Sequence, residues 1–112
     1  MSGAPVVIVT GAAEGIGWAT AQQLALAGWT VALFDLNGAQ AAARAQALGA
    51  EHSAWACDVT DADVVQARVA EVVAQHGRVD ALVNNAGIAD QTAPTLRQDI
   101  AAFDKVLSVH LR

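Results

Sequence analysis

The chain has 112 residues, 54% of them hydrophobic and 15% charged, which suits one small folded domain and argues against a disordered segment. Six basic against eleven acidic residues give a net charge of −5, and no cluster of Lys and Arg forms a stripe that could bind nucleic acid. Cys57 is the only cysteine, so an intrachain disulfide is excluded, and no metal site with the usual Cys and His spacing is expected. Because the sequence shows no basic leader and no apolar run of the ~18 residues that a membrane span needs, we expect a cytoplasmic protein that binds neither membrane nor nucleic acid.

Apolar, β-branched runs alternate with helix-forming segments along the sequence. The runs predict strands over residues 5–10, 30–35, 53–57 and 80–84. Ala-, Leu- and Val-rich segments predict helices over residues 16–27, 39–48 and about 60–76, each followed by a glycine, and a further helix from about residue 99. This alternation predicts an α/β fold of Rossmann type, with a doubly wound parallel sheet in the strand order 3-2-1-4 and helices on both faces. Since such a sheet ordinarily continues beyond a fourth strand, we expect residues 1–112 to form a single but partial, truncated domain.

The third predicted helix has a recognisable start and one apolar face. Thr60, with Asp63 three residues later, resembles a capping box. Apolar positions then recur at helical spacing and predict one buried stripe. Its members are Val65, Val69, Val72, Val73 and His76. We interpret His52 and His76 as surface or helix-end residues.

Residues 10–17 read TGAAEGIG and stand between a predicted strand and a predicted helix, the context that a dinucleotide-binding turn requires. Gly11 permits a tight turn, Gly15 lets the backbone approach a diphosphate, and Gly17 permits close packing of the helix on the strand. The start of the helix directs unpaired N–H groups and a partial positive charge at the same anion. The alternative is a glycine-rich turn that binds no ligand.

Asp35 ends the second predicted strand, close to the ~20-residue offset from the glycines at which an acid binds the ribose hydroxyls of adenosine. Taken alone, such an acid could equally cap the helix that follows. A carboxylate at this position repels a 2′-phosphate, Glu14 adds to the repulsion, and neither Arg nor Lys is present in the loop to offset it. The expected cofactor is therefore NAD rather than NADP.

Three motifs at these separations resemble the short-chain dehydrogenase/reductase family. They are the TGAAEGIG turn, Cys57-Asp58-Val59 after the third strand, and the NNAG sequence of residues 84–87 after the fourth. The resemblance covers the whole chain and is more specific than a glycine turn alone. It implies an NAD-dependent oxidoreductase that, in the complete enzyme, moves hydride between the cofactor and an alcohol or ketone.

The resemblance also implies roles for particular residues. Asp58 would hydrogen-bond the adenine amino group and Val59 would contact its ring, whereas Asn84 and Gly87 would shape the floor beneath the adenosine and the nicotinamide ribose. Asp58 could instead cap the next helix, and Asn84 could mainly tie strands together. The predicted cofactor-binding residues are Gly11, Ala13, Glu14, Gly15, Ile16, Gly17, Asp35, Leu36, Asp58, Val59, Asn85, Ala86, Gly87 and Ile88.

The chain departs from the family in its catalytic residues. Members transfer hydride with a Tyr that acts as acid or base, a Lys four residues later and a Ser that orients the substrate carbonyl. This chain has no tyrosine, its only lysine is Lys105 on the last predicted helix, and Ser2, Ser53 and Ser108 lie in other segments. His110 stands where the family usually has an Asn that holds a water; an imidazole could relay a proton there, or it could be a core residue with its hydrogen bond satisfied. His110 is the only candidate catalytic residue, and the 112 residues alone are expected to be inactive.

Three functions stay open on this reasoning. The chain is the NAD(H)-binding portion of an oxidoreductase, or a non-catalytic dinucleotide-binding module, or a structural fragment that acts by association. A small-molecule substrate is expected only in a complete enzyme. Apolar surface on the last predicted helix and at the fourth strand predicts a homo-oligomer, most simply a dimer.

Overall fold

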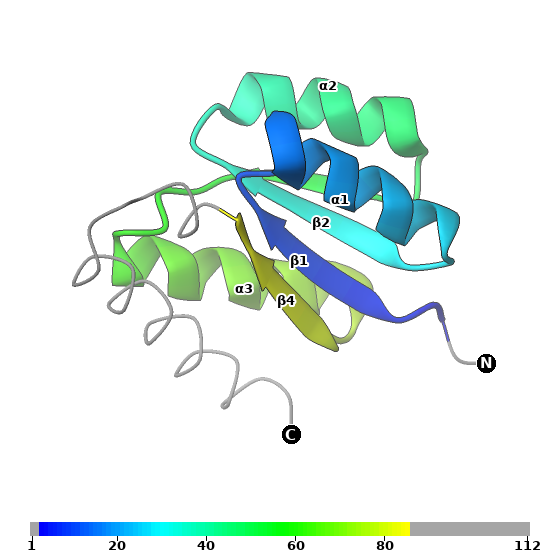
Figure 1. Cartoon of the computed structure of the whole chain (residues 1–112). Helices are drawn as coiled ribbons and strands as arrows, with labels where there is room; N and C mark the ends of the chain where they lie inside the picture. The colour runs from blue at the N-terminus through cyan, green and yellow to red at the C-terminus, as the bar shows by residue number, and fades with distance from the viewer. Residues whose placement is uncertain (1–2, 86–112) are drawn as a thin grey trace.

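The computed structural model describes residues 3–85, and it has the predicted alternation of strands and helices (Figure 1). The predicted helix from residue 99 and most of the loop before it lie outside these residues. The elements in chain order are β1 (Val6–Thr10), α1 (Gly15–Leu26), β2 (Thr30–Asp35), α2 (Gly38–Leu48), β3 (Ser53–Ala56), α3 (Ala62–His76) and β4 (Ala81–Asn84). Their bounds agree with the predicted ones to within about two residues.

The four strands form one parallel sheet in the order β3-β2-β1-β4, which confirms the predicted doubly wound arrangement. β1 pairs with β2 from Val6 opposite Thr30, and with β4 from Val7 opposite Ala81. Every residue of β1 is buried, as expected for the central strand of a sheet that is covered on both faces.

Helices cover both faces of the sheet: α1 and α2 lie on one side and α3 on the other (Figure 1). The side chains of β1 alternate between the two layers because strand side chains have a period of two residues. Ile8 packs with Phe34 and with the buried valines of α3, whereas Val7 and Val9 pack in a second cluster toward α1 and α2. Two cores therefore hold the central strand from opposite sides.

The third helix confirms the apolar stripe only in part. Val65, Val69 and Val72 are buried, but Val73 and His76 are half-buried at the side and end of the helix. The capping box predicted at Thr60 is wrong. Asp61 is the N-cap, and its carboxylate accepts from the N–H groups of residues 63 and 64.

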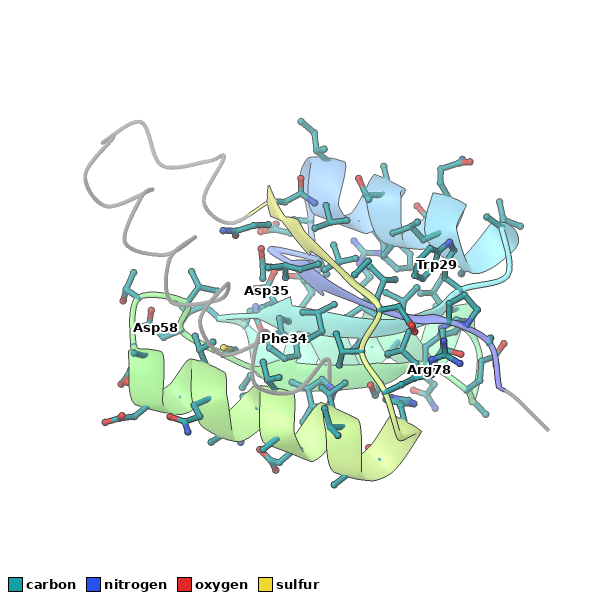
Figure 2. The ribbon with its side chains drawn as sticks, turned by 90° about the horizontal axis from the view of Figure 1, so that it is seen from below. Trp29, Phe34, Asp35, Asp58 and Arg78 are labelled. Carbon is teal, nitrogen blue, oxygen red and sulfur yellow. The ribbon has the colours of Figure 1, made fainter. Side chains whose placement is uncertain are left out.

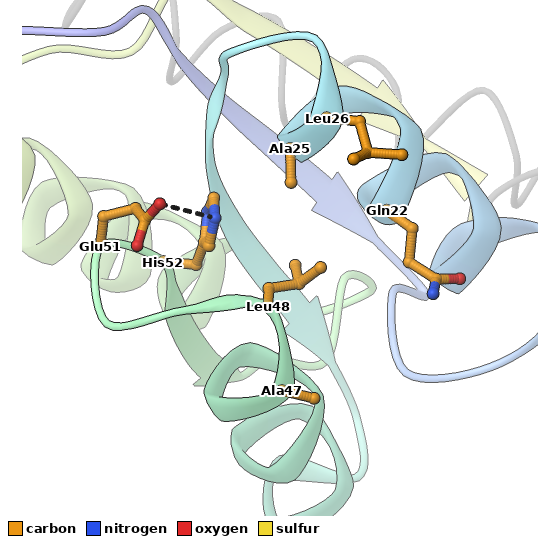
Figure 3. Close-up of a pocket in the computed structure, with 7 residues that line it drawn as sticks. All are labelled: Gln22, Ala25, Leu26, Ala47, Leu48, Glu51 and His52. Carbon is orange, nitrogen blue, oxygen red and sulfur yellow. Dashed lines mark ion pairs between the residues drawn. The ribbon is translucent and has the colours of Figure 1, made fainter.

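His52 lies at the amino edge of the sheet and is buried, so its interpretation as a surface residue is wrong. The N–H of Val31 donates to His52 Nδ1 at 3.0 Å, which places the ring hydrogen on Nε2, 3.5 Å from the carboxylate of Glu51. This pair lies beside a hollow of about 270 Å³ between the C-terminal ends of α1 and α2 (Figure 3). Both helices end there and the strands begin there, so this hollow lies at the edge opposite the glycine turn.

At the same edge, Asp80 ties the start of β1 to β4. Its Oδ2 accepts from the N–H of Val6 at 2.8 Å, and its own N–H donates to the Val6 carbonyl. Arg78 closes the arrangement with two bonds of 2.8 Å, from Nε to Oδ2 and from Nη2 to Oδ1. Figure 2 shows Arg78 and Trp29 toward one end of the sheet, and Asp35 and Asp58 toward the other.

Candidate functional site

The loops that leave the carboxyl ends of the strands meet at one edge of the sheet. They are the glycine turn after β1, the Asp35 corner after β2, the Asp58 corner after β3, and the Asn84-Asn85 exit from β4. The chain crosses from β1 toward β2 and β3 and returns to β4 on the other side of β1. Open parallel sheets form a ligand-binding crevice at such a point of reversal.

The glycine turn has the backbone shape that its sequence predicts. Gly11 and Gly15 have φ angles of 60° and 58°, a conformation that residues with a side chain rarely adopt. A Cβ on Gly15 would meet nothing within 4 Å, so the backbone is open to an approaching group. A Cβ on Gly17 would lie only 1.9 Å from the carbonyl oxygen of Gly11, so α1 packs directly on the turn. Glycine is thus required for two separate reasons: the backbone angle at Gly11 and Gly15, and close packing at Gly17.

The N-terminus of α1 opens toward this edge without a side-chain cap. Glu14 is the N-cap residue, and its side chain makes no capping hydrogen bond. The first N–H groups of a helix have no partner within the helix, so they are available to an acceptor outside it. Ile16, in the first turn, is 72% exposed.

Asp35 is joined to the glycine turn and does not cap α2. Its Oδ2 accepts from the Ala13 N–H at 3.0 Å and its Oδ1 from the Asn37 N–H at 2.9 Å. The cap of α2 is Asn37, whose side chain accepts from the N–H of Gln40. The helix-cap alternative for Asp35 is therefore excluded, and a carboxylate with roughly four acceptor positions still has room for further donors. The adjacent Leu36 is 75% exposed.

Arg44 of α2 reaches the same turn, which the sequence reasoning missed. Its Nε donates to the carbonyl of Ala13 at 3.1 Å, and its guanidinium carbon lies 4.8 Å from the centre of the Trp18 ring. The contact joins residues 31 positions apart, so only the packing of α2 beside α1 creates it. No local motif could have identified Arg44, although it is the only arginine in the predicted second helix.

The corner after β3 is built around Asp58. Its Oδ1 accepts from the hydroxyl of Thr60 at 2.6 Å and from the N–H of Thr60 at 3.0 Å. These bonds, the one from the hydroxyl above all, lower the pKa of the Asp58 carboxyl from its ordinary value of 3.8. Since Asp61 caps α3, the helix-cap alternative for Asp58 is also excluded. Val59 is half-buried against the core on the α3 side.

The preceding Cys57 is buried, and burial raises the pKa of its thiol to about 11. A thiol with so high a pKa is a weak nucleophile at neutral pH. Cys57 therefore packs in the core beside the Asp58 corner as a protonated thiol at neutral pH.

The end of β4 contributes two asparagines. The hydroxyl of Thr10 donates to Asn84 Oδ1 at 2.8 Å, so Asn84 ties the ends of β1 and β4 as the structural alternative expects. The side-chain nitrogen of Asn85 is buried, and it has no hydrogen-bond partner among residues 3–85. A buried donor without an acceptor is costly, so this nitrogen suits an acceptor that a ligand would supply. The predicted residues Ala86, Gly87, Ile88 and His110 lie outside the described part of the chain.

The described residues show neither a metal cluster nor a membrane helix. Within residues 3–85 there is no group of three or more His, Cys, Asp or Glu side chains that could bind a metal ion. In the same range no helix combines the length and the hydropathy that a membrane span requires.

Comparison with known proteins identifies relatives along nearly the whole chain. A family model described as short chain dehydrogenase matches residues 5–112. D-threitol dehydrogenase of Mycolicibacterium smegmatis is 44% identical over 109 residues, covering 95% of this chain and 42% of that protein. Cis-4-hydroxycyclohexanecarboxylate dehydrogenase of Sinomonas cyclohexanicum is 44% identical over 108 residues, covering 95% of this chain and 43% of that protein.

A solved structure gives the same result for the fold. The crystal structure of 3-ketoacyl-(acyl-carrier-protein) reductase from Brucella melitensis, complexed with NADH, superposes with a TM-score of 0.68 at 31% identity. The match covers 71% of this chain and 33% of that one. The chain thus spans less than half the length of the relatives it matches.

Proposed function

Because the chain belongs to the short-chain dehydrogenase family, we propose that it forms the part of an oxidoreductase that binds NAD(H). The observation that carries the proposal is the joint built by Ala13 and Asp35, which connects the glycine turn to a carboxylate at the end of the neighbouring strand. One side of this joint suits a diphosphate and the other suits a ribose. A dinucleotide contains both groups at adjacent positions.

The diphosphate lies, on this proposal, at the turn between Gly11 and Gly17. Gly15 leaves its backbone open, and the uncapped start of α1 offers N–H groups and a partial positive charge. Ala13 and Glu14 supply backbone at the same turn. Ile16 projects an exposed apolar side chain beside it, which the bound cofactor would cover on the nicotinamide side.

The adenosine half lies across the ends of β2 and β3. Asp35 accepts hydrogen bonds from the ribose hydroxyls with the acceptor positions that Ala13 and Asn37 leave free. Asp58 and Val59 contact the adenine, and the exposed Leu36 lies next to Asp35 on the same corner. Asn85 donates its side-chain N–H, which has no partner among residues 3–85, to the cofactor. Ala86, Gly87 and Ile88 lie outside the described residues and stay predicted cofactor-binding residues.

The same residues favour NAD over its 2′-phosphorylated form. Asp35 and Glu14 place negative charge where a 2′-phosphate would lie. Arg44 approaches from α2, but its Nε is committed to the Ala13 carbonyl and its guanidinium lies over Trp18. We therefore assign the chain to NAD.

Hydride transfer belongs to a complete protein on this proposal. The nicotinamide supplies or accepts the hydride when it is bound, and the protein fixes its position. The 112 residues contain no tyrosine, so they do not turn over an alcohol by the family's tyrosine mechanism. On this proposal their role is to bind the cofactor. The proposed catalytic role of His110, the homo-oligomer and the cytoplasmic location stay predictions; sedimentation of the full chain tests the oligomer.

Titration of the protein with NAD and NADP by calorimetry tests the proposal. We expect NAD to bind at least about tenfold more tightly than NADP, because the carboxylate of Asp35 bonds a ribose hydroxyl and repels a phosphate. Asp35→Asn should lower NAD affinity about tenfold and narrow the preference over NADP. The matched control is Asp63→Asn, which removes the same charge from the first turn of α3 and should leave both affinities unchanged. An absence of NAD binding at millimolar concentration would refute the proposal.

A further inference from the structure

Ala13, in the middle of the glycine turn, is fully buried, and charged side chains hold both polar groups of its backbone. Its N–H donates to Asp35 Oδ2 and its carbonyl accepts from Arg44 Nε, at 3.0 and 3.1 Å. Asp35 ends β2 and Arg44 lies within α2. The turn is therefore held by two side chains of opposite charge, one from β2 and one from α2.

Arg44 joins three parts of the molecule at this point. It starts on α2, its guanidinium lies over the Trp18 ring on α1, and its Nε donates to the turn that precedes α1. A planar guanidinium can lie over a ring face and donate in its own plane at the same time. A lysine ammonium at this position would keep the charge, but it would lose the planar guanidinium over the ring and the donor at the Nε position.

The bond to Ala13 also orients the next peptide group. The carbonyl of Ala13 and the N–H of Glu14 belong to one trans peptide plane, in which the two groups point in opposite directions. Holding the carbonyl against Arg44 therefore turns its negative end toward α2 and the Glu14 N–H away from it. Without this bond the carbonyl oxygen is free to rotate toward an anion at the turn, which would repel the anion.

We propose that Arg44 is a positioning residue for the diphosphate: it fixes the Ala13–Glu14 peptide so that the glycine turn presents N–H groups rather than a carbonyl to the cofactor. The inference rests on the proposed function, because it requires a diphosphate at the turn. Arg44 acts through the turn and does not itself contact the cofactor. Its effect should consequently fall on ligands that contain a diphosphate, and spare those that contain only the nucleoside.

Calorimetric titration of the full chain with NAD, ADP and adenosine tests this role in Arg44→Lys and Arg44→Met. Both variants should bind NAD and ADP about tenfold more weakly, the effect expected for one charge-assisted hydrogen bond, while adenosine affinity changes by less than about twofold. The matched control is Arg78→Lys, since Arg78 bonds only Asp80 in the described part of the chain, at the opposite edge. It should leave all three affinities unchanged.

The variants separate positioning from simple attraction of an anion. If Arg44→Lys binds ADP as tightly as the unaltered protein, charge alone matters and the proposal is overturned. Equal losses for ADP and adenosine also overturn it, because they indicate a general loosening of the fold. Should neither Arg44 variant fold, Trp18→Leu removes the ring that holds the Arg44 guanidinium beside the Ala13 carbonyl. An unchanged ratio of ADP to adenosine affinity in that variant contradicts the proposal. Failure of the proposed function looks different, since the unaltered protein would then bind no NAD.

Discussion

Two aspartates fix the two ends of β1, and they do so in different ways. At the amino edge, Asp80 accepts the N–H of Val6, and Arg78 bonds both oxygens of the same carboxylate. At the carboxyl edge, Asp35 accepts the N–H of Ala13, but the arginine there bonds the Ala13 carbonyl and not the carboxylate. Arg78 thus occupies acceptor positions on both oxygens of Asp80, whereas no arginine of residues 3–85 bonds Asp35, which keeps acceptor positions for other donors.

The comparison shows how one residue type serves stability at one edge and binding at the other. A paired carboxylate next to a strand start stabilises the sheet, whereas a carboxylate whose charge is left to solvent or ligand can recognise a hydroxyl. What distinguishes the two is the atom that the neighbouring arginine bonds. Substitutions at the two edges should therefore have separable effects on stability and on cofactor affinity.

The largest expected effect comes from the glycines at the two edges. Gly17→Ala at the carboxyl edge should lower the free energy of unfolding by about 3 kcal/mol, because the new Cβ would lie 1.9 Å from the Gly11 carbonyl oxygen and α1 must move off the turn. Gly28→Ala at the amino edge meets nothing within 4 Å and suffers only from a φ of 100°. It should cost about 1 kcal/mol.

Chemical denaturation measures both values, and NAD titration completes the comparison. Gly17→Ala should also weaken NAD binding, whereas Gly28→Ala should not. Equal stability losses in the two variants would contradict the close packing of α1 on the turn at Gly17. An NAD affinity that Gly17→Ala leaves unaltered would contradict a cofactor site at the carboxyl edge.

Asp80→Ala should have a smaller effect, and only on stability. It leaves the buried N–H of Val6 without its side-chain acceptor and Arg78 without a partner, which should lower the free energy of unfolding by about 2 kcal/mol at pH 7. The hydrogen bonds from Arg78 and then from the Val6 N–H lower the pKa of Asp80 below 3.8. Its contribution is thus complete above about pH 3.8 and is lost as the pH falls through the lowered pKa.

Urea denaturation at several pH values checks this prediction. The difference in the free energy of unfolding between the unaltered protein and Asp80→Ala should shrink below pH 3.8. The dissociation constant for NAD at pH 7 should be the same in the two proteins. Asp63→Ala serves as the control, with an expected cost of about 0.5 kcal/mol from the lost helix-dipole interaction. A weakened NAD affinity in Asp80→Ala would show that the two edges are not independent.

The sequence predicted the features that depend on local pattern. Strands and helices follow from hydrophobic periodicity and glycine positions, which act within about twenty residues. The strand order follows from the alternation of these strands and helices, which is typical of a doubly wound sheet. Asp35 could be found because it stands at a fixed offset from the glycine turn, and Gly17 because the turn has a known spacing.

The features that the sequence did not predict depend on contacts between distant residues, or on a choice between two neighbouring residues that could both cap a helix. Arg44 reaches Ala13 only after α1 and α2 pack, and His52 is buried because its Nδ1 meets the N–H of Val31, 21 positions away. The cap of α3 moved by one residue, because Thr60 and Asp61 are both good caps and the Thr60 hydroxyl bonds Asp58 instead.

The smallest expected effect separates His76 from Asp80 within the amino edge. The indole N–H of Trp55 donates to Ser53 Oγ at 2.8 Å, and Ser53 Oγ shares a second hydrogen bond, also of 2.8 Å, with Nε2 of His76. Burial, and after it the nearby His52, lowers the pKa of His76 below its ordinary 6.5. A lowered pKa means that the unfolded chain binds this proton more tightly than the folded protein does. The contribution of His76 to stability is therefore complete above about pH 6.5 and falls as the pH drops below it.

His76→Gln offers an acceptor oxygen that does not titrate. It should cost about 1 kcal/mol or less at pH 8, and it should remove part of the loss of stability between pH 7 and pH 5 that the unaltered protein shows. Thermal unfolding across this range measures the difference, with NAD affinity at pH 8 expected to be equal in both proteins. An identical pH dependence in the variant would contradict the prediction, because it would mean that protonation of His76 makes no measurable contribution to the loss of stability in this range.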